Sequence, residues 1–143
     1  MKVRDLMTNE VITLKAKHTL QDAAKLMLDL NVGVIPVAEE GDKLRGIITD
    51  RDIVVRAVSK GADITKAKIN DYMSPKLVSI NPSESAEEAA KLMAEHQIRR
   101  LPVVEEGHMV GIISIGDLSV VDIHENEAAF ALHDISTPAR PQL

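Results

Sequence analysis

Two short sequences in this chain combine a hydroxyl and a carboxylate at the same spacing. Thr49-x-x-Asp52 and Ser114-x-x-Asp117 each place the carboxylate three residues after the hydroxyl, where a helix is expected to begin. This spacing is the capping-box pattern, in which the two side chains bond free N–H groups of the first helical turn. The same groups could hold a ligand, because an ionised carboxylate accepts from two neighbouring hydroxyls and free backbone N–H groups receive phosphate. The two roles can coexist.

Both pairs belong to a sequence that occurs twice. Residues 7–53 and 73–118 align in register, with a single residue dropped before Gly46 and Gly111. A repeat of this length indicates one duplicated supersecondary unit, and we expect the two copies to pack with pseudo-two-fold symmetry. Two related units create a matched pair of clefts, which favours binding over a single catalytic centre.

Each copy shows the patterns of a β-α-β-β-α unit. The first copy predicts strands at 11–14, 34–38 and 44–49, a helix that begins at His18 or Thr19, and a second helix at 50–59; the second copy predicts strands at 77–80, 100–104 and 109–114, a helix capped by Ser85, and a second helix at 115–122. Pro36 and Pro102 cannot donate to a ladder, so their strands need a break or an unpaired edge. The predicted fold class is α+β, with two βαββα repeats at 1–58 and 69–122, a linker at 59–68 and a C-terminal tail at 123–143 that could hold one more helix.

Composition excludes several functional classes. The chain has no cysteine, which removes disulfides, thiolate nucleophiles and cysteine-bound metals and fits a reducing cytosol. A net charge of −5 disfavours nucleic acid as a partner. No stretch approaches the ~18 apolar residues of a membrane span, and the N-terminus is too polar for a signal peptide. With one Tyr, one Phe and no Trp, the core is expected to be aliphatic.

The sequence offers no catalytic or metal signature. Its five histidines lack metal spacing, and no Gly-rich loop of the Walker or dinucleotide-binding type is present. We therefore expect no catalytic residues, no metal ligands and no enzymatic activity.

The repeated motifs resemble those of a tandem pair of cystathionine-β-synthase (CBS) domains, the arrangement called a Bateman module. The resemblance covers about residues 3–121 and is carried by the repeated unit, by the apolar-Pro-Val strands and by Gly-Ile-Ile-[Thr/Ser]-x-x-Asp at 46–52 and 111–117. The segment His-Gln-Ile-Arg-Arg-Leu-Pro-Val at 96–103 is similar to one in small stand-alone bacterial proteins of this kind.

The resemblance implies a regulatory module with adenosine compounds in two clefts between the repeats: AMP, ADP or ATP, or else NAD or S-adenosylmethionine. By motif, Asp52 and Asp117 would bind the ribose hydroxyls, and Thr49 and Ser114 would contact ribose or phosphate. The backbone around Ile35-Pro36 and Leu101-Pro102 would border the base. No obligatory cofactor is implied.

Three arginines are the candidate phosphate-binding cations. Arg99 and Arg100 stand in the second copy, where the first copy has Gly33 and Val34, so the two clefts should differ and the second should prefer more phosphate. Arg51 could partly compensate in the first copy. The alternative is that these cations bridge to nearby acids or lie on a solvated face.

We therefore expect a cytoplasmic energy or metabolite sensor that acts on a protein target in trans. A homodimer is expected because the apolar stripes of the first helices of both copies, such as Leu20, Ala23, Ala24, Met27 and Leu28, lack a partner in a module of two units. The alternative function is a nucleotide-independent dimeric interaction or scaffold protein, in which the Thr/Ser-x-x-Asp pairs are only helix caps.

Overall fold

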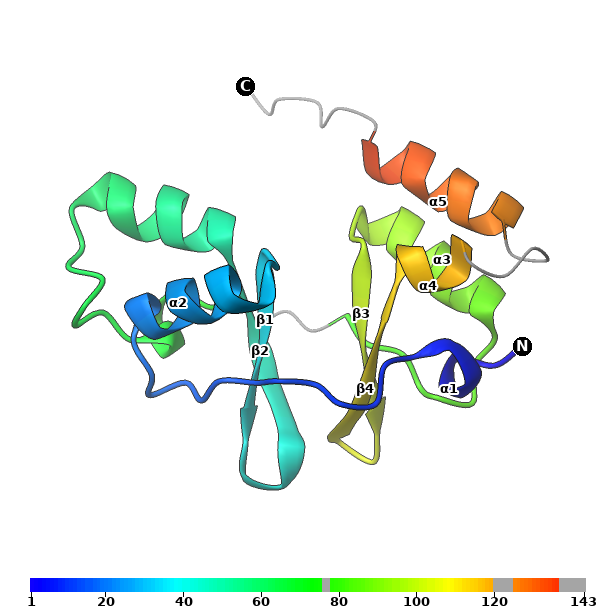
Figure 1. The fold of residues 1–143 in the computed structure, drawn as a ribbon, viewed down its shortest axis with the longest axis horizontal. Helices are drawn as coiled ribbons and strands as arrows, with labels where there is room; N and C mark the ends of the chain where they lie inside the picture. Colours follow the sequence, from blue (N-terminus) through cyan, green and yellow to red (C-terminus); the bar gives the residue numbers. More distant parts are fainter. Residues whose placement is uncertain (76–77, 120–124, 137–143) are drawn as a thin grey trace. The chain divides into compact units, whose positions relative to one another are not determined.

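A computed structural model describes residues 1–75, 78–119 and 125–136, and its elements follow the predicted repeat (Figure 1). The helices are α1 (Val3–Leu6), α2 (Leu20–Leu30), α3 (Ala86–His96), α4 (Ile115–Ser119) and α5 (Glu125–Ser136); the strands are β1 (Val34–Glu39), β2 (Lys43–Thr49), β3 (Arg100–Glu105) and β4 (His108–Ser114). Short 3-10 helices lie at η1 (Glu40–Asp42), η3 (Val58–Lys60) and η4 (Ile69–Asp71), and a π-helix, η2, lies at Asp52–Ala57. The α+β class is confirmed.

The chain forms two compact units. Each unit holds most of one sequence copy together with the opening segment of the other copy. Unit 1 comprises Met1–Val11, Val78–Glu106 and Val110–Leu143, and unit 2 comprises Ile12–Leu77 and Gly107–Met109. The opening segment of the first copy therefore packs with the second copy. The predicted boundaries, which divide the chain by sequence repeat, stay a prediction.

Capping and turn residues explain the helices and hairpins. Thr19 caps α2, with its side chain accepting from the Asp22 N–H, and Ser85 caps α3 by accepting from the Glu88 N–H. In unit 2, β1 pairs antiparallel with β2, with an irregularity between Val37 and Ala38. Glu106 and Gly107 both have positive φ, at 52° and 82°, as a tight hairpin turn between β3 and β4 requires.

The strands predicted at 11–14 and 77–80 are shorter than expected. Leu14 forms a single parallel bridge to Val37, and Ile80 forms one to Val103. The Leu14 N–H donates to the Pro36 carbonyl at 3.1 Å and the Leu14 carbonyl accepts from Ala38 at 2.9 Å. The preceding rung of a parallel ladder would need an N–H on Pro36, which proline lacks, so pairing stops after one bridge. Pro102 limits the second copy in the same way, and residues 76–77 lie outside the described part.

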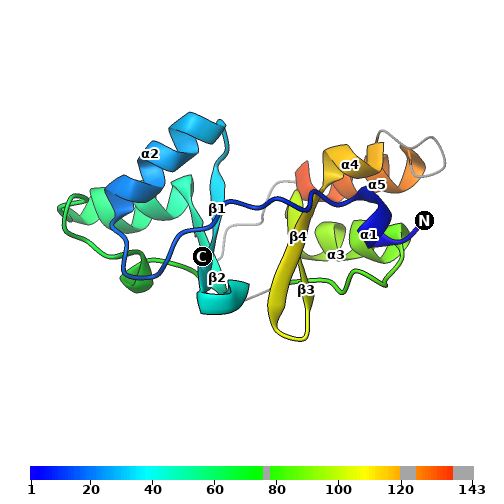
Figure 2. The ribbon, with the colours of Figure 1, turned by 60° about the horizontal axis from the view of Figure 1, so that its bottom comes forward.

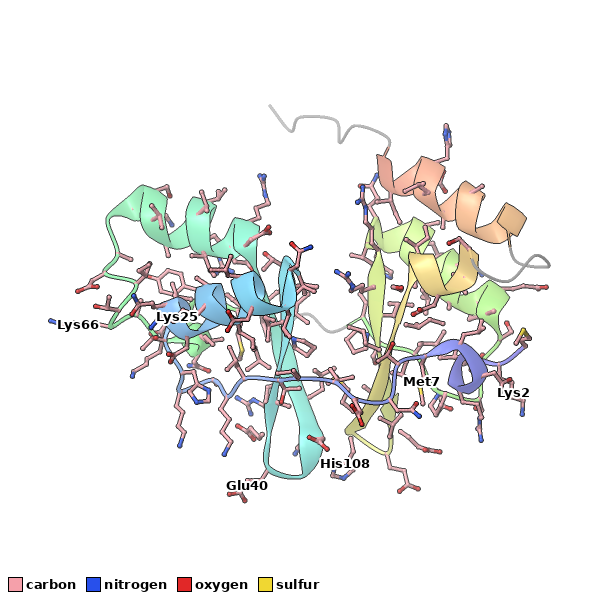
Figure 3. All side chains as sticks on the ribbon, in the orientation of Figure 1. Lys2, Met7, Lys25, Glu40, Lys66 and His108 are labelled. Carbon is pink, nitrogen blue, oxygen red and sulfur yellow. The ribbon has the colours of Figure 1, made fainter. Side chains whose placement is uncertain are left out.

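Each unit is closed by the opening segment of the other sequence copy. In unit 1, the Thr8 N–H donates to Ile112 at 2.9 Å and the Ile112 N–H donates back at 3.0 Å. In unit 2, Ser74 and Ile47 exchange the same pair of bonds, at 2.9 and 3.2 Å. A Cβ on Gly111 would lie 2.6 Å from the Met7 sulfur, and one on Gly46 would lie 2.6 Å from the Ser74 oxygen. The glycine of the repeated motif therefore permits the close approach of the closing segment; Figure 3 labels Met7 beside β4.

Two aliphatic clusters form the cores, as the composition predicts. Leu20, Ile35 and Ile48 are among the fully buried residues of unit 2, and Met93, Leu101 and Ile113 are among those of unit 1. In unit 1, α5 packs on α3 and α4, and Figures 1 and 2 both show it beside them. Among the described helices, none has the length and apolar character that crossing a bilayer requires.

The apolar stripe of α2 is not uniformly buried. The expectation that the whole stripe lacks a partner is wrong, because Leu20, Ala23 and Met27 lie in the core of unit 2, and Leu28 is the member that is 80% exposed. Its counterpart in the second copy, Ala94, is 7% exposed. The two units therefore differ on their outer helical faces.

Candidate functional site

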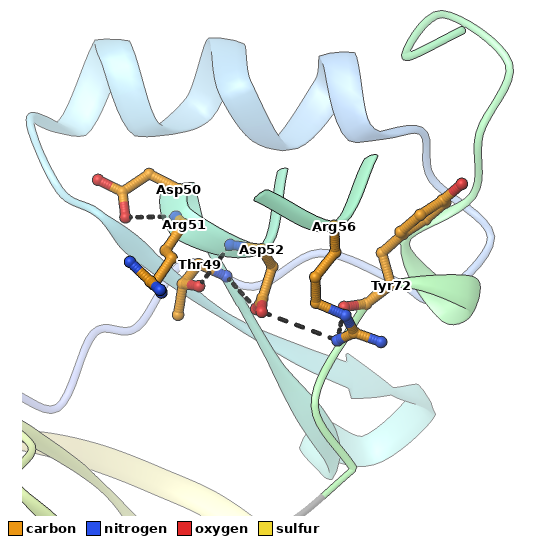
Figure 4. Close-up of polar contacts among 6 residues, drawn as sticks. All are labelled: Thr49, Asp50, Arg51, Asp52, Arg56 and Tyr72. Atoms are coloured by element: carbon orange, nitrogen blue, oxygen red, sulfur yellow. Dashed lines mark hydrogen bonds and ion pairs between the residues drawn. The ribbon is translucent and has the colours of Figure 1, made fainter. Parts of the chain in front are cut away.

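In unit 2, Thr49 and Asp52 form a reciprocal pair where β2 passes into the following helix (Figure 4). The Thr49 N–H donates to Asp52 Oδ2 at 3.0 Å, and the Asp52 N–H donates to Thr49 Oγ1 at 3.0 Å. Both side chains are half-buried. The threonine oxygen acts as an acceptor in this pair, so its hydroxyl proton remains available to donate to another group.

Unit 1 repeats this geometry at the end of β4. The Ser114 N–H donates to Asp117 Oδ2 at 2.8 Å, and the Asp117 N–H donates to Ser114 Oγ at 3.1 Å. The predicted capping pattern is therefore present in both copies. A box of the same geometry also opens α2, where Thr19 and Asp22 bond each other at 2.9 and 3.2 Å. The same geometry therefore also serves a helix cap for which no ligand role is predicted.

The two pairs differ in what occupies the second carboxylate oxygen. Arg56 Nη1 lies 3.7 Å from Asp52 Oδ1 and donates to the Tyr72 carbonyl at 2.7 Å. In the part of the chain that the structure describes, Asp117 has no ion pair. Arg56 is not among the site residues predicted from the sequence, although its position four residues after Asp52 on a helix is the spacing of a stabilising ion pair.

The residues beside the two pairs carry opposite charge. In unit 1, the Ile115 N–H donates to the Arg99 carbonyl at 2.8 Å, which places Arg99 next to Ser114. In unit 2, the corresponding bond runs from Asp50 to the Gly33 carbonyl at 2.9 Å, and a Cβ on Gly33 would lie 2.9 Å from Asp50 Oδ2. An exposed acid thus stands beside the Thr49 pair, where the second copy has Ile115.

Arg51, Arg99 and Arg100 are exposed. The Arg51 N–H donates to Asp50 Oδ1 at 2.8 Å, and Figure 4 shows the Arg51 guanidinium away from Asp52. None of the three is in a salt bridge among the described residues, where the ion pairs are Arg45–Glu39 and Arg56–Asp52. They remain candidate phosphate cations.

The predicted base-contacting segments have buried side chains. Ile35 is 1% exposed and Leu101 is fully buried, while Pro36 and Pro102 are also buried. Any contact with a ligand would therefore use the main chain. The Pro36 and Pro102 carbonyls already accept from Leu14 and Ile80, which leaves each one further lone pair.

One surface hollow of unit 2 contains none of the predicted site residues. It has a volume of about 440 Å³ and is lined by Lys15, Ala16, Lys17, Glu39 and Glu40; Figure 3 labels Glu40 at the hairpin turn. Within the described ranges, no group of three or more His, Cys, Asp or Glu side chains could hold a metal ion.

Comparison with known proteins identifies the repeated unit. The family model "CBS domain" matches residues 3–59 and 69–122. The CBS domain-containing protein YhcV of Bacillus subtilis is 47% identical over 134 residues, which cover 94% of each chain.

Two solved structures show the same fold. The structure of Hypoxic Response Protein I with two coordinated zinc ions has a TM-score of 0.78 and 32% identity, covering 84% of this chain and 98% of that one. The CBS domain pair of protein MJ0100, in complex with 5′-methylthioadenosine and S-adenosyl-L-methionine, has a TM-score of 0.74 and 27% identity, covering 87% and 98%.

Proposed function

Because the chain belongs to the CBS domain family and contains two copies of that domain, a regulatory module, we propose that it senses an adenosine-containing metabolite. Asp52 and Asp117 accept the ribose hydroxyls, and Thr49 and Ser114 donate to ribose or phosphate. The observation that carries this proposal is the repetition of one hydroxyl–carboxylate geometry at the corresponding position of both copies.

The chemistry of the pair suits a vicinal diol. In each copy, the capping bond uses Oδ2 of the carboxylate, and among the described residues no backbone N–H donates to Oδ1. Two adjacent hydroxyls can share one carboxylate through charge-assisted bonds, which are the stronger class. MJ0100, whose CBS pair holds two adenosine-containing ligands, supports this ligand class for the present chain.

Calorimetric titration of the purified, ligand-free protein tests this proposal. AMP, ADP, ATP, NAD and S-adenosylmethionine are titrated in turn into the wild type, Asp52→Ala and Asp117→Ala. Loss of the diol bonds to a charged acceptor should weaken binding at the altered site by at least about tenfold.

The capping box of α2 provides the matched control. Asp22→Ala removes a carboxylate of the same geometry from a position with no proposed ligand role. It should lower stability like the site variants, by about 1 kcal/mol as for a lost cap, and leave binding unchanged. Binding that is equally weak in all three variants would show that cap loss, not ligand contact, is the cause.

We further propose that the module is a homodimer and that a second copy covers the exposed helical face of unit 2. Leu28 is 80% exposed, Val54 58%, Val55 46% and Val58 52%. In unit 1, the corresponding helices α3 and α4 are covered by α5. Light scattering after size exclusion should give a dimer for the wild type and a monomer for Leu28→Glu with Val54→Glu; a monomeric wild type would contradict this proposal.

The same exposed face favours a second candidate function, a nucleotide-independent interaction or scaffold protein. In that function the Thr49 and Ser114 pairs act only as caps, as the Thr19 pair does. A folded, ligand-free protein that binds none of the five adenosine compounds but still dimerises would support it. In either function, we propose that the regulated protein is bound in trans.

A further inference from the structure

We propose that Arg56 is an internal competitor for Asp52, so that the ribose site of unit 2 is weaker than that of unit 1. The inference rests on the proposed function, because it concerns how the same two carboxylates receive a ligand. In this proposal, Arg56 determines the difference in ligand affinity between the Asp52 site and the Asp117 site.

Arg56 is held at two points. Its Nη1 lies 3.7 Å from Asp52 Oδ1, and the same nitrogen donates to the Tyr72 carbonyl at 2.7 Å (Figure 4). The Arg56 side chain is 47% exposed, but that of Asp52 is only 17% exposed. The carbonyl bond therefore fixes the cation over a carboxylate that is largely shielded from water.

Both oxygens of Asp52 are engaged before any ligand arrives. Oδ2 accepts from the Thr49 N–H, and Oδ1 faces Arg56. A ribose diol that approaches this carboxylate has to share Oδ1 with the guanidinium or displace it.

The second copy has no arginine at the position that corresponds to Arg56. Asp117 Oδ2 accepts from the Ser114 N–H, and no ion pair to Asp117 occurs among the described residues. The sequence has Val121 at the position four residues after Asp117, where the first copy has Arg56. A diol therefore finds one carboxylate oxygen of Asp117 unpaired by any cation that the structure describes.

A neutral nucleoside is the appropriate probe. The cation opposes diol binding at Asp52, but it would attract a phosphate, so the two effects cancel in part for a nucleotide. Adenosine carries no phosphate and reports the competition alone. Partly exposed ion pairs are weak, and removing this one should strengthen adenosine binding at Asp52 about two- to fivefold.

The experiment isolates the site of unit 2 by removing the other. Adenosine is titrated calorimetrically into Asp117→Ala and into Asp117→Ala with Arg56→Met, and the wild type is titrated alongside. Methionine keeps an unbranched apolar chain and removes the charge. The control is Asp117→Ala with Arg45→Met, because Arg45 is also an exposed arginine of unit 2 paired with a carboxylate, that of Glu39 at 3.5 Å.

Tighter adenosine binding in the Arg56 variant, with no change in the Arg45 control, supports the inference. Equal binding in the two backgrounds, or weaker binding without Arg56, overturns it and leaves the proposed function intact as long as the wild type binds. If adenosine binds neither the wild type nor any variant, both the proposed function and this inference fall. Urea unfolding of each variant confirms that a change in binding does not arise from a loss of fold.

Discussion

Gly46→Ala should be among the most damaging single-methyl additions in unit 2. A Cβ at this position would lie 2.6 Å from the Ser74 carbonyl oxygen and 3.2 Å from the Met73 sulfur. The sulfur belongs to a flexible side chain and can move, but the oxygen belongs to the backbone. The backbone segments around Gly46 and Ser74 must separate by about 0.8 Å to restore an ordinary contact of 3.4 Å.

The magnitude follows from what that separation disrupts. Ile47 and Ser74 exchange two hydrogen bonds at 3.2 and 2.9 Å, and the longer one is already near the limit of good geometry. Each lost bond costs about 1 kcal/mol, and overpacking a well-packed site costs about 1–3 kcal/mol. We expect a loss of about 2–4 kcal/mol, a large share of the ~5–15 kcal/mol that stabilises a typical domain.

Tyrosine fluorescence gives an assay specific to unit 2. Tyr72 is the only tyrosine of the chain, and it packs against the core cluster of unit 2, two residues before Ser74. Urea unfolding followed by this signal should show a transition at lower denaturant for Gly46→Ala than for the wild type, with the free energy taken from midpoint and slope.

Gly116→Ala adds the same methyl group in unit 1, and its urea unfolding is followed by circular dichroism because Tyr72 reports on unit 2. A Cβ on Gly116 would meet nothing closer than the Ser114 hydroxyl at 3.5 Å, and the residue lies inside α4. Replacing a helical glycine by alanine should be neutral or stabilise by about 0.5–1 kcal/mol. A Gly46→Ala transition within about 0.5 kcal/mol of wild type, a change typical of surface substitutions, would refute the close approach of the closing segment.

Two further predictions concern charge. The pKa of Asp22 is lowered, first by the Thr19 N–H and then by the Thr19 hydroxyl, so its contribution to stability is complete above the ordinary value of 3.8 and is lost as pH falls through the lower folded-state pKa. Asp22→Asn should therefore be less stable than wild type at neutral pH, and the gap in urea midpoint should close at pH well below 3.8. Arg99→Met with Arg100→Met should weaken ATP binding more than adenosine binding; equal calorimetric losses for both ligands would exclude a phosphate role.

The duplicated sequence made most of the fold predictable. Matching patterns such as the two apolar-Pro-Val strands and the two Thr/Ser-x-x-Asp pairs fix element order, and Thr19 and Ser85 are caps where the sequence predicts helix starts. The lengths of the first strands were not predictable in the same way. The first strand of the first copy pairs with the strand that contains Pro36, and Pro36 lacks the N–H that a longer ladder would need. The local sequence pattern of a strand does not reveal which other strand it pairs with.

The site was predictable as a set of residue types and not as a set of contacts. The capping bonds of Asp52 and Asp117 follow from spacing, but the fixing of Arg56 by the Tyr72 carbonyl joins residues from different elements. The acid at Asp50 beside Gly33 also depends on the pairing of β1 with β2. Contacts between residues far apart in the sequence cannot be predicted from the spacing of apolar residues along it.

The exchange of opening segments also sets an order of events during synthesis. Nearly all of unit 2 lies between Ile12 and Leu77, so its contacts can form as soon as that stretch has left the ribosome. Unit 1 needs Thr8 to meet Ile112, and this closes a loop roughly four times as long as that between Ile47 and Ser74, at an entropic cost about 1.2 kcal/mol higher. The first eleven residues therefore remain unpaired until β4 has been synthesised, when almost the whole chain has been made. A nascent chain arrested before β4 would hold a folded unit 2 and an N-terminal segment still open to proteases.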